Sequence, residues 1–263
     1  GLSTEQIAKQ LGIQGIIDTI STACSSGANS IMHGARLLSA NKLDRVIVGG
    51  ADPIAIFNVK GFSSLSIYDP EACKPFDNDR KGMNLGEGAA YLILENEYSL
   101  SQTGNKVLCE LVGWNNSSDA FHQSASSAEG LGSTLAMNKA MQKAGLVPDQ
   151  IDYINAHGTG TGNNDLSESI AFVNVFGEKV PPFSSTKGFT GHTLGAAGAI
   201  EAVFSIQALL EQALLPNLNF STAMEEIGLL PVSSYKPNVS IENVMSNSFG
   251  FGGNCTSLIF QKA

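Results

Sequence analysis

The sequence has few cysteines, and their spacing suggests neither disulfides nor a metal site. Cys24, Cys73, Cys109 and Cys255 are widely separated, and none belongs to a CxxC pair or to a cluster with histidine. Zinc sites and disulfide-rich folds both depend on closely spaced cysteines. We therefore expect a reduced, cytoplasmic protein that holds no metal.

Positive charge is also scarce, since 15 lysines and arginines stand against 24 acidic residues, for a net charge of −9. This balance excludes nucleic acid as the principal partner. No apolar run reaches the roughly 20 residues of a transmembrane helix, so no membrane association is expected. The chain is long enough for one large domain or two moderate ones.

Short apolar runs alternate with amphipathic segments along the whole chain. Strands are predicted at 16–20, 45–51, 88–95, 152–157 and 255–261, helices at 28–40, 131–144, 166–176 and 195–212, and a long loop at 52–87. This alternation predicts an α/β fold with parallel or mixed sheets. Both halves share the strand–helix rhythm, which predicts two similar units, residues 1–100 and 101–263, with small-residue helices packed between the sheets.

Cys24 lies in the stretch Ser21-Thr-Ala-Cys-Ser-Ser-Gly27, where a predicted strand turns into a helix. Its small neighbours allow a tight turn and close approach by a substrate. A helix N-terminus lowers the pKa of a thiol and offers N–H groups to an oxyanion. A buried structural cysteine is the alternative interpretation.

Two histidines lie at predicted strand or helix ends. His157 follows a buried strand in Asn155-Ala-His-Gly-Thr-Gly-Thr161, and His192 precedes a helix in a glycine-rich segment. Ligands of α/β proteins bind at strand ends, although a lone histidine is more often structural. A cysteine with two histidines suits acyl transfer, because the thiolate accepts an acyl group and two neutral imidazoles donate to an enolate.

Four motifs occur in one order along the chain: Thr22-Ala-Cys-Ser-Ser-Gly, Asn155-Ala-His-Gly-Thr-Gly-Thr, Ser185-Thr-Lys-Gly-Phe-Thr-Gly-His192, and Asn247-Ser-Phe-Gly-Phe-Gly-Gly. Together they resemble the β-ketoacyl-[acyl-carrier-protein] synthases, most closely the elongating, synthase II-like type of the thiolase superfamily. The resemblance implies a layered α-β-α-β-α fold of two similar halves and a decarboxylative Claisen condensation of an acyl thioester with malonyl-acyl carrier protein.

The resemblance also implies a role for individual residues. Cys24 resembles the nucleophile, while His157 and His192 resemble the pair that stabilises the enolate. Lys187 resembles a lysine that acts electrostatically near His192, its alternative being a surface lysine, and Glu201 a buried partner of that lysine. Other matched residues are Thr159 and Thr161 for the phosphopantetheine arm, Phe251 for the gate and, with the N–H of Cys24, the oxyanion hole, and Asp119 and Phe249 as supporting residues.

The same resemblance implies which partners to expect. Phosphopantetheine arrives on the acyl carrier protein, so no free cofactor is needed, and a homodimer is expected. The carrier is acidic, so a basic patch is required; Lys60, Lys74, Arg80 and Lys81 are candidates, although each could be an ordinary surface charge.

The sequence departs from the family pattern in three places. Asn163-Asn164 stand where a proline and a small residue are usual, and Asn254-Cys255 stand where Thr-Asn is usual. Members of the family also carry a large region before the nucleophile, so we expect the first half to be incomplete, with a missing segment or partner chain completing it.

Three other interpretations stay open: a non-catalytic partner that sets chain length or binds a carrier, an inactive fragment, and a thiolase. A thiolase needs a second reactive cysteine, for which Cys255 is the candidate. Two histidines fit the synthase better.

Overall fold

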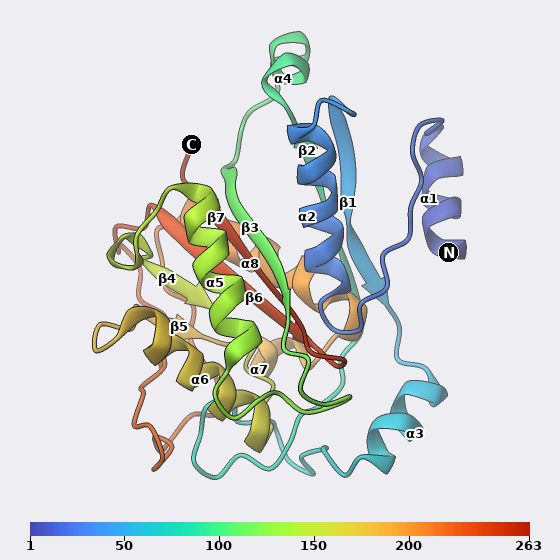
Figure 1. Ribbon diagram of the computed structural model, residues 1–263. Helices are drawn as coiled ribbons and strands as arrows, with labels where there is room; N and C mark the ends of the chain where they lie inside the picture. The colour runs from blue at the N-terminus through green and yellow to red at the C-terminus, as the bar shows by residue number, and fades with distance from the viewer.

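The computed structural model describes residues 1–263 as two sheets with helices between and outside them (Figure 1). The first sheet pairs β1 (Arg45–Asp52) with β2 (Gly88–Glu95), antiparallel. The second has the order β3-β7-β6-β4-β5, formed by Glu110–Ser118, Asn254–Gln261, Asn243–Gly250, Tyr153–Asn155 and Phe183–Ser184. Only β4 pairs in parallel, with β5 and β6, so the second sheet is mixed.

Two helices form the layer between the sheets, α2 (Ser26–Ser39) and α8 (Ala197–Glu211). Both contain small residues where they meet: a Cβ added at Gly27 would lie 2.7 Å from the backbone N of Ala199, and one at Gly198 would lie 2.7 Å from that of Ala28. Side chains larger than hydrogen would force the helices apart. The predicted close packing of small-residue helices between sheets therefore agrees with the structure.

Apart from η2 (Leu194–Ala196), which runs directly into α8, the remaining helices lie outside this central layer (Figure 1). On the far face of the second sheet, α5 (Leu131–Ala144) packs against β3 and β7 and contacts α6 (Gly162–Phe176). A cluster including Met137, Phe172 and Ile259 fills this interface, and a second, including Ile31 and Val244, fills the space between the sheets. Shorter elements are α1 (Leu2–Leu11), α3 (Ile56–Ser64), α4 (Glu97–Thr103), α7 (Lys187–Thr190), η1 (Pro148–Gln150) and η2 (Leu194–Ala196).

The structure corrects several sequence predictions in the first half. Residues 16–20, predicted as a strand, are irregular, and Ile16 and Ile17 are exposed because no strand pairs with them. The runs at 45–51 and 88–95 do form strands, but they are antiparallel and mostly half-buried rather than buried and parallel. The predicted loop 52–87 contains helix α3, which buries none of its side chains.

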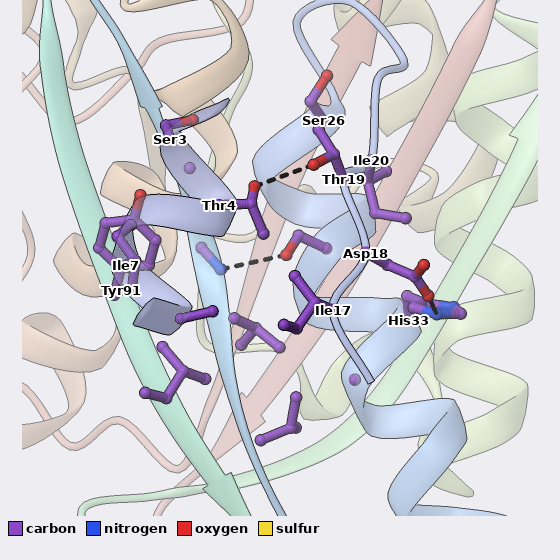
Figure 2. Close-up of a pocket in the computed structure, with 18 of the residues that line it drawn as sticks. Ser3, Thr4, Ile7, Ile17, Asp18, Thr19, Ile20, Ser26, His33 and Tyr91 are labelled. Carbon is purple, nitrogen blue, oxygen red and sulfur yellow. Dashed lines mark hydrogen bonds and ion pairs between the residues drawn. The ribbon is translucent and has the colours of Figure 1, made fainter. Parts of the chain in front are cut away.

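A hollow of about 310 Å³ lies beside β1, between α1, the irregular segment 13–21 and α2 (Figure 2). Thr4 on α1 meets Thr19 on that segment through a hydroxyl hydrogen bond of 3.0 Å, and Asp18 lies 3.5 Å from His33 on α2. The first sheet thus has two strands where the second has five, with a hollow along β1.

Residues Leu194–Glu211, which form η2 and α8, are long and apolar enough to cross a membrane by length and composition alone. The sequence analysis expected no such run. In the structure this stretch is the central helix between the sheets, and 61% of it is buried, which is the usual environment of a core helix.

Candidate active site

A cavity of about 400 Å³ gathers residues that are far apart in the sequence. Cys24, His157 and His192 all line it, together with Phe249 and with Phe251, the predicted gate residue. Other lining residues are Phe62, Lys81, Asp119, Thr159, Thr161 and Cys255. The three residues predicted to carry the chemistry are therefore brought to one place.

Cys24 lies in a sharp turn just before α2, whose N-cap is Ser25. Ala23 in this turn has φ +53°, a left-handed conformation that is strained for a residue with a Cβ. The turn packs against the end of β6, since a Cβ added at Gly250 would lie 2.9 Å from the Thr22 carbonyl oxygen and 3.2 Å from the Cys24 nitrogen. The β6–β7 hairpin thus packs directly against the turn that carries Cys24.

Backbone N–H groups of Phe251 and of Cys24 itself donate toward the sulfur and lower the pKa of the thiol. Burial acts more strongly in the opposite direction and raises the pKa of Cys24 to about 11, with Lys187 offsetting part of the rise. The prediction that the helix N-terminus makes Cys24 a thiolate is therefore wrong for the free protein. Desolvation in the closed cavity outweighs the helix end.

Cys24 alkylation should consequently become faster with increasing pH, without a plateau at pH 7 to 9. Only the thiolate reacts, and a raised pKa keeps the thiolate fraction small until the pH approaches about 11. The measurement is the rate constant of iodoacetamide modification at Cys24, followed by peptide mass spectrometry between pH 6 and 10. A plateau below pH 8 contradicts the expected burial effect.

The two histidines meet edge to face, with ring centroids 5.3 Å apart and an angle of 84°. His157 follows the carboxyl end of β4, and His192 follows α7, after β5. The N–H of Leu194 donates to Nδ1 of His192 over 3.1 Å, and the Lys187 ammonium lies 3.3 Å from Nδ1 of His157. Because Nδ1 accepts in both rings, each carries its proton on Nε2.

Both histidines are neutral at ordinary pH. Burial lowers the pKa of His157 and of His192 well below the usual value, and the charge of Lys187 lowers both further. Two neutral imidazoles that carry Nε2–H groups can donate hydrogen bonds to a developing oxyanion.

Lys187 is 1% exposed, which excludes the surface-lysine alternative. Its ammonium forms a buried ion pair with Oε1 of Glu201 on α8 and donates to the carbonyl oxygen of His157. The predicted electrostatic action of Lys187 on His192 agrees with its effect on the pKa of that histidine, while its hydrogen bonds go to His157. Burial raises the pKa of the Glu201 carboxyl, and Lys187 partly offsets that rise. The ion pair thus keeps the Lys187 ammonium beside His157, shielded from water.

The remaining predicted residues surround the cavity. Thr159 and Thr161 share a hydroxyl hydrogen bond of 2.8 Å. Phe249 is buried with its ring 5.9 Å from that of His157. Asp119 contacts the turn 251–253 between β6 and β7 (the gate turn, which carries the predicted gate residue Phe251), because its N–H donates to the carbonyl oxygen of Gly253 over 2.7 Å.

Sequence reasoning missed two residues of the site. Phe62 on α3 stacks on Phe251 with ring centroids 5.7 Å apart, but it lies in a stretch predicted as loop. Glu168 accepts from the backbone N–H groups of His157 and Gly158 at 2.9 and 2.8 Å, and burial raises its pKa to about 8. A carboxylate in an otherwise apolar helix was the available signal for Glu201, whereas α6 contains several other polar residues and gave no such signal for Glu168.

Two segments of the chain match models of one protein family. Residues 4–99 match the family described as "Beta-ketoacyl synthase, N-terminal domain", and residues 108–221 match "Beta-ketoacyl synthase, C-terminal domain". The 3-oxoacyl-[acyl-carrier-protein] synthase 2 of Staphylococcus aureus (strain COL) is 39% identical over 269 residues, which covers 99% of this chain and 65% of that protein. The chain thus spans less than two thirds of that relative's length.

Solved structures give the same picture. A ketosynthase (ApeO) in complex with its chain length factor (ApeC), from Xenorhabdus doucetiae, matches with 41% identity and a TM-score of 0.91, covering 99% of this chain and 63% of that one. A type II PKS acyl-carrier protein in complex with its ketosynthase bound to the hexaketide (AntDE:AntF) matches with 27% identity and a TM-score of 0.94, covering 99% and 66%.

Proposed function

Because the chain belongs to the β-ketoacyl synthase family, we propose that it performs decarboxylative condensation of an acyl thioester with malonyl-acyl carrier protein. The observation that carries this proposal is the meeting of Cys24, His157 and His192 in one cavity. The products are a 3-oxoacyl-acyl carrier protein and CO₂. The protein thereby acts as an acyltransferase of the cytoplasm, in fatty acid or polyketide synthesis.

In the first step, the sulfur of Cys24 forms a bond to the acyl carbonyl carbon, and the carrier's pantetheine thiol leaves with the cysteine's proton. The N–H groups of Cys24 and Phe251, which point at the sulfur, supply hydrogen bonds to the carbonyl oxygen as it gains charge.

In the second step, the malonyl thioester loses CO₂, and the electrons of the broken C–C bond move to the thioester oxygen. The Nε2–H groups of His157 and His192 hold that enolate. Its carbon then attacks the acyl carbonyl on Cys24, forming the new C–C bond and releasing the cysteine sulfur as a thiolate, which takes up a proton from solvent to restore the thiol. Lys187 keeps the His157 ring oriented and its charge keeps both rings neutral, while Glu201 holds Lys187 in place.

No free cofactor takes part in this scheme, because phosphopantetheine arrives on the carrier. Thr159 and Thr161 are proposed to bind that arm, as their place in the cavity wall supports. Phe251 is proposed as the gate, with Phe249 and the Asp119 loop as its supports. The boundary near residue 100 is proposed to separate a half that carries the nucleophile from one that carries both histidines.

The retained cysteine argues against a non-catalytic partner that only sets chain length, since such a partner needs no nucleophile. A homodimer is proposed, supported by the exposed Ile16 and Ile17 ahead of the nucleophile turn. Further polypeptide, from the same gene product or a partner chain, is proposed to complete the first sheet, as the hollow along β1 supports.

The direct test is to supply acyl- and malonyl-acyl carrier protein and to follow 3-oxoacyl product and an acylated Cys24 by mass spectrometry. Product with acylation at Cys24 supports the synthase. Carrier binding without acylation of a folded sample supports the non-catalytic partner instead.

The carrier is expected to dock beside the cavity entrance, where Lys81 is exposed and lines the opening, with Lys74 nearby in sequence. The Lys74→Glu/Lys81→Glu variant should raise the KM for malonyl-acyl carrier protein about tenfold or more, because the carrier is acidic, while kcat changes little. Lys139→Glu/Lys143→Glu on α5, the same charge change on another element, is the control. If the two variants have equal KM values, the carrier does not dock on the face that carries Lys74 and Lys81.

A further inference from the structure

Asn254 begins β7, directly after the glycine pair that ends the gate turn. Its side-chain oxygen Oδ1 lies 2.7 Å from each of three donors: the hydroxyl of Ser25, the amide nitrogen of Asn29 and the amide nitrogen of Asn116. The first two donors lie on or at the start of α2, and the third lies on β3. One oxygen therefore joins the nucleophile helix to the second sheet.

The donors on α2 also hold the turn that contains Cys24. Ser25 follows Cys24 directly, and its single hydroxyl hydrogen is shared between Oδ1 of Asn254 and the carbonyl oxygen of Thr22, 2.8 Å away. The amide of Asn29 donates with its second hydrogen to the hydroxyl of Thr22, over 2.8 Å. This turn includes the strained φ of Ala23. A strained backbone persists only where its surroundings fix it, and the network around Asn254 provides that support.

Asn254 also positions the backbone N–H of Phe251, which lies on the other side of the Cys24 sulfur. Asn254 stands opposite Gly250 in the β6–β7 register, and the turn between them carries Phe251, whose N–H donates toward the Cys24 sulfur. Thr256, two residues along β7, continues the network with a 2.8 Å hydrogen bond from its hydroxyl to Oδ1 of Asn29. A shift of the hairpin relative to α2 would thus move the Phe251 donor away from the sulfur.

We propose that Asn254 is a positioning residue that holds the gate hairpin and the nucleophile turn in fixed register, and so sets the reactivity of Cys24. The inference rests on the proposed function. It also gives a role to a position where the sequence departs from the family pattern, since asparagine stands here in place of the usual threonine. Asparagine reaches farther and offers a carbonyl oxygen that can accept from several donors at once.

The test measures the rate constant of iodoacetamide modification at Cys24 as a function of pH. Asn254→Ala should react about tenfold more slowly at pH 8, which is about 1.4 kcal/mol of activation free energy, and its pH profile should shift to higher pH. Gln261→Ala is the matched control. It removes an amide hydrogen bond of 2.9 Å to Asn243 between the same two strands, at the far end of the hairpin, and should leave rate and profile within twofold.

A double-mutant cycle separates positioning from general loss of stability. Ser25→Ala removes one donor to Asn254, so the Ser25→Ala/Asn254→Ala variant should react about as slowly as Asn254→Ala alone. The inference is overturned if the rate reductions of the two single variants multiply in the double variant. It is also overturned if Asn254→Ala reacts within twofold of the rate of the unaltered protein. If Asn254→Ala does not fold, the pH profiles of the iodoacetamide rate constant for Ser25→Ala and Gln261→Ala are compared instead. The inference requires the profile of Ser25→Ala to lie at higher pH. An unaltered protein whose Cys24 reacts at no pH refutes the proposed function itself.

Discussion

Replacing Cys24 by alanine is expected to lower condensation by at least about a thousandfold while leaving the protein folded. The acyl group has no other acceptor in the mechanism, and losing the nucleophile of a covalent mechanism is among the largest single-residue effects on kcat. The fold should be kept, because alanine fits the space of the buried side chain, which is 5% exposed. The measurement is 3-oxoacyl product formed per minute from acyl- and malonyl-acyl carrier protein.

Cys109→Ala is the matched control for this experiment. Cys109 is half-buried just before β3 and does not line the cavity, so its loss should leave the rate within about twofold. Mass spectrometry should find the acyl group on Cys24 of the control and on no residue of Cys24→Ala. Condensation by Cys24→Ala at the control's rate would falsify the covalent mechanism, and acylation at Cys255 would point to a thiolase-like use of that residue.

The second large effect is expected on stability, from Glu201→Leu. Lys187 is 1% exposed and Glu201 is 3% exposed, so removing the carboxylate leaves an ammonium charge buried without its partner. Breaking a buried ion pair in this way costs about 3–5 kcal/mol, which for a chain of this size lowers the melting temperature by roughly 10 °C. The measurement is urea unfolding followed by circular dichroism.

The double variant Lys187→Met/Glu201→Leu serves as the control for Glu201→Leu. It replaces both charges by apolar side chains of similar size, so it should recover most of the lost stability. Activity should not recover, since the double variant removes the ammonium that lies beside Nδ1 of His157. If the double variant is as unstable as Glu201→Leu, the cost comes from packing around α8 rather than from an unpaired charge.

The location of the site followed directly from local sequence. Cys24 was expected where the chain turns into a helix, and α2 begins two residues later. His157 was expected at the end of a strand, and β4 ends at Asn155. The helix 131–144 was predicted with the bounds of α5, because Gly145 ends it in a left-handed conformation that glycine adopts without strain.

Contacts between residues far apart in the sequence could not be predicted from local patterns, and for these contacts the predictions were wrong or absent. The apolar run 16–20 has the composition of a strand, but a strand exists only when a neighbour pairs with it, and no strand does so here. Phe62 joined the site only because α3 folds back toward the gate turn and stacks it on Phe251. No pattern within residues 52–87 indicates that contact.

The amino-acid sequence by itself determined the α/β class and placed Cys24, His157 and His192 at the ends of helices or strands, because these features depend on residue type and on short-range spacing. Tertiary structure alone decided the protonation of these groups. Burial raises the pKa of Cys24 to about 11, and burial together with Lys187 lowers those of His157 and His192. The free energy of a charge depends on the water and the charges around it, and these are assembled from distant parts of the chain.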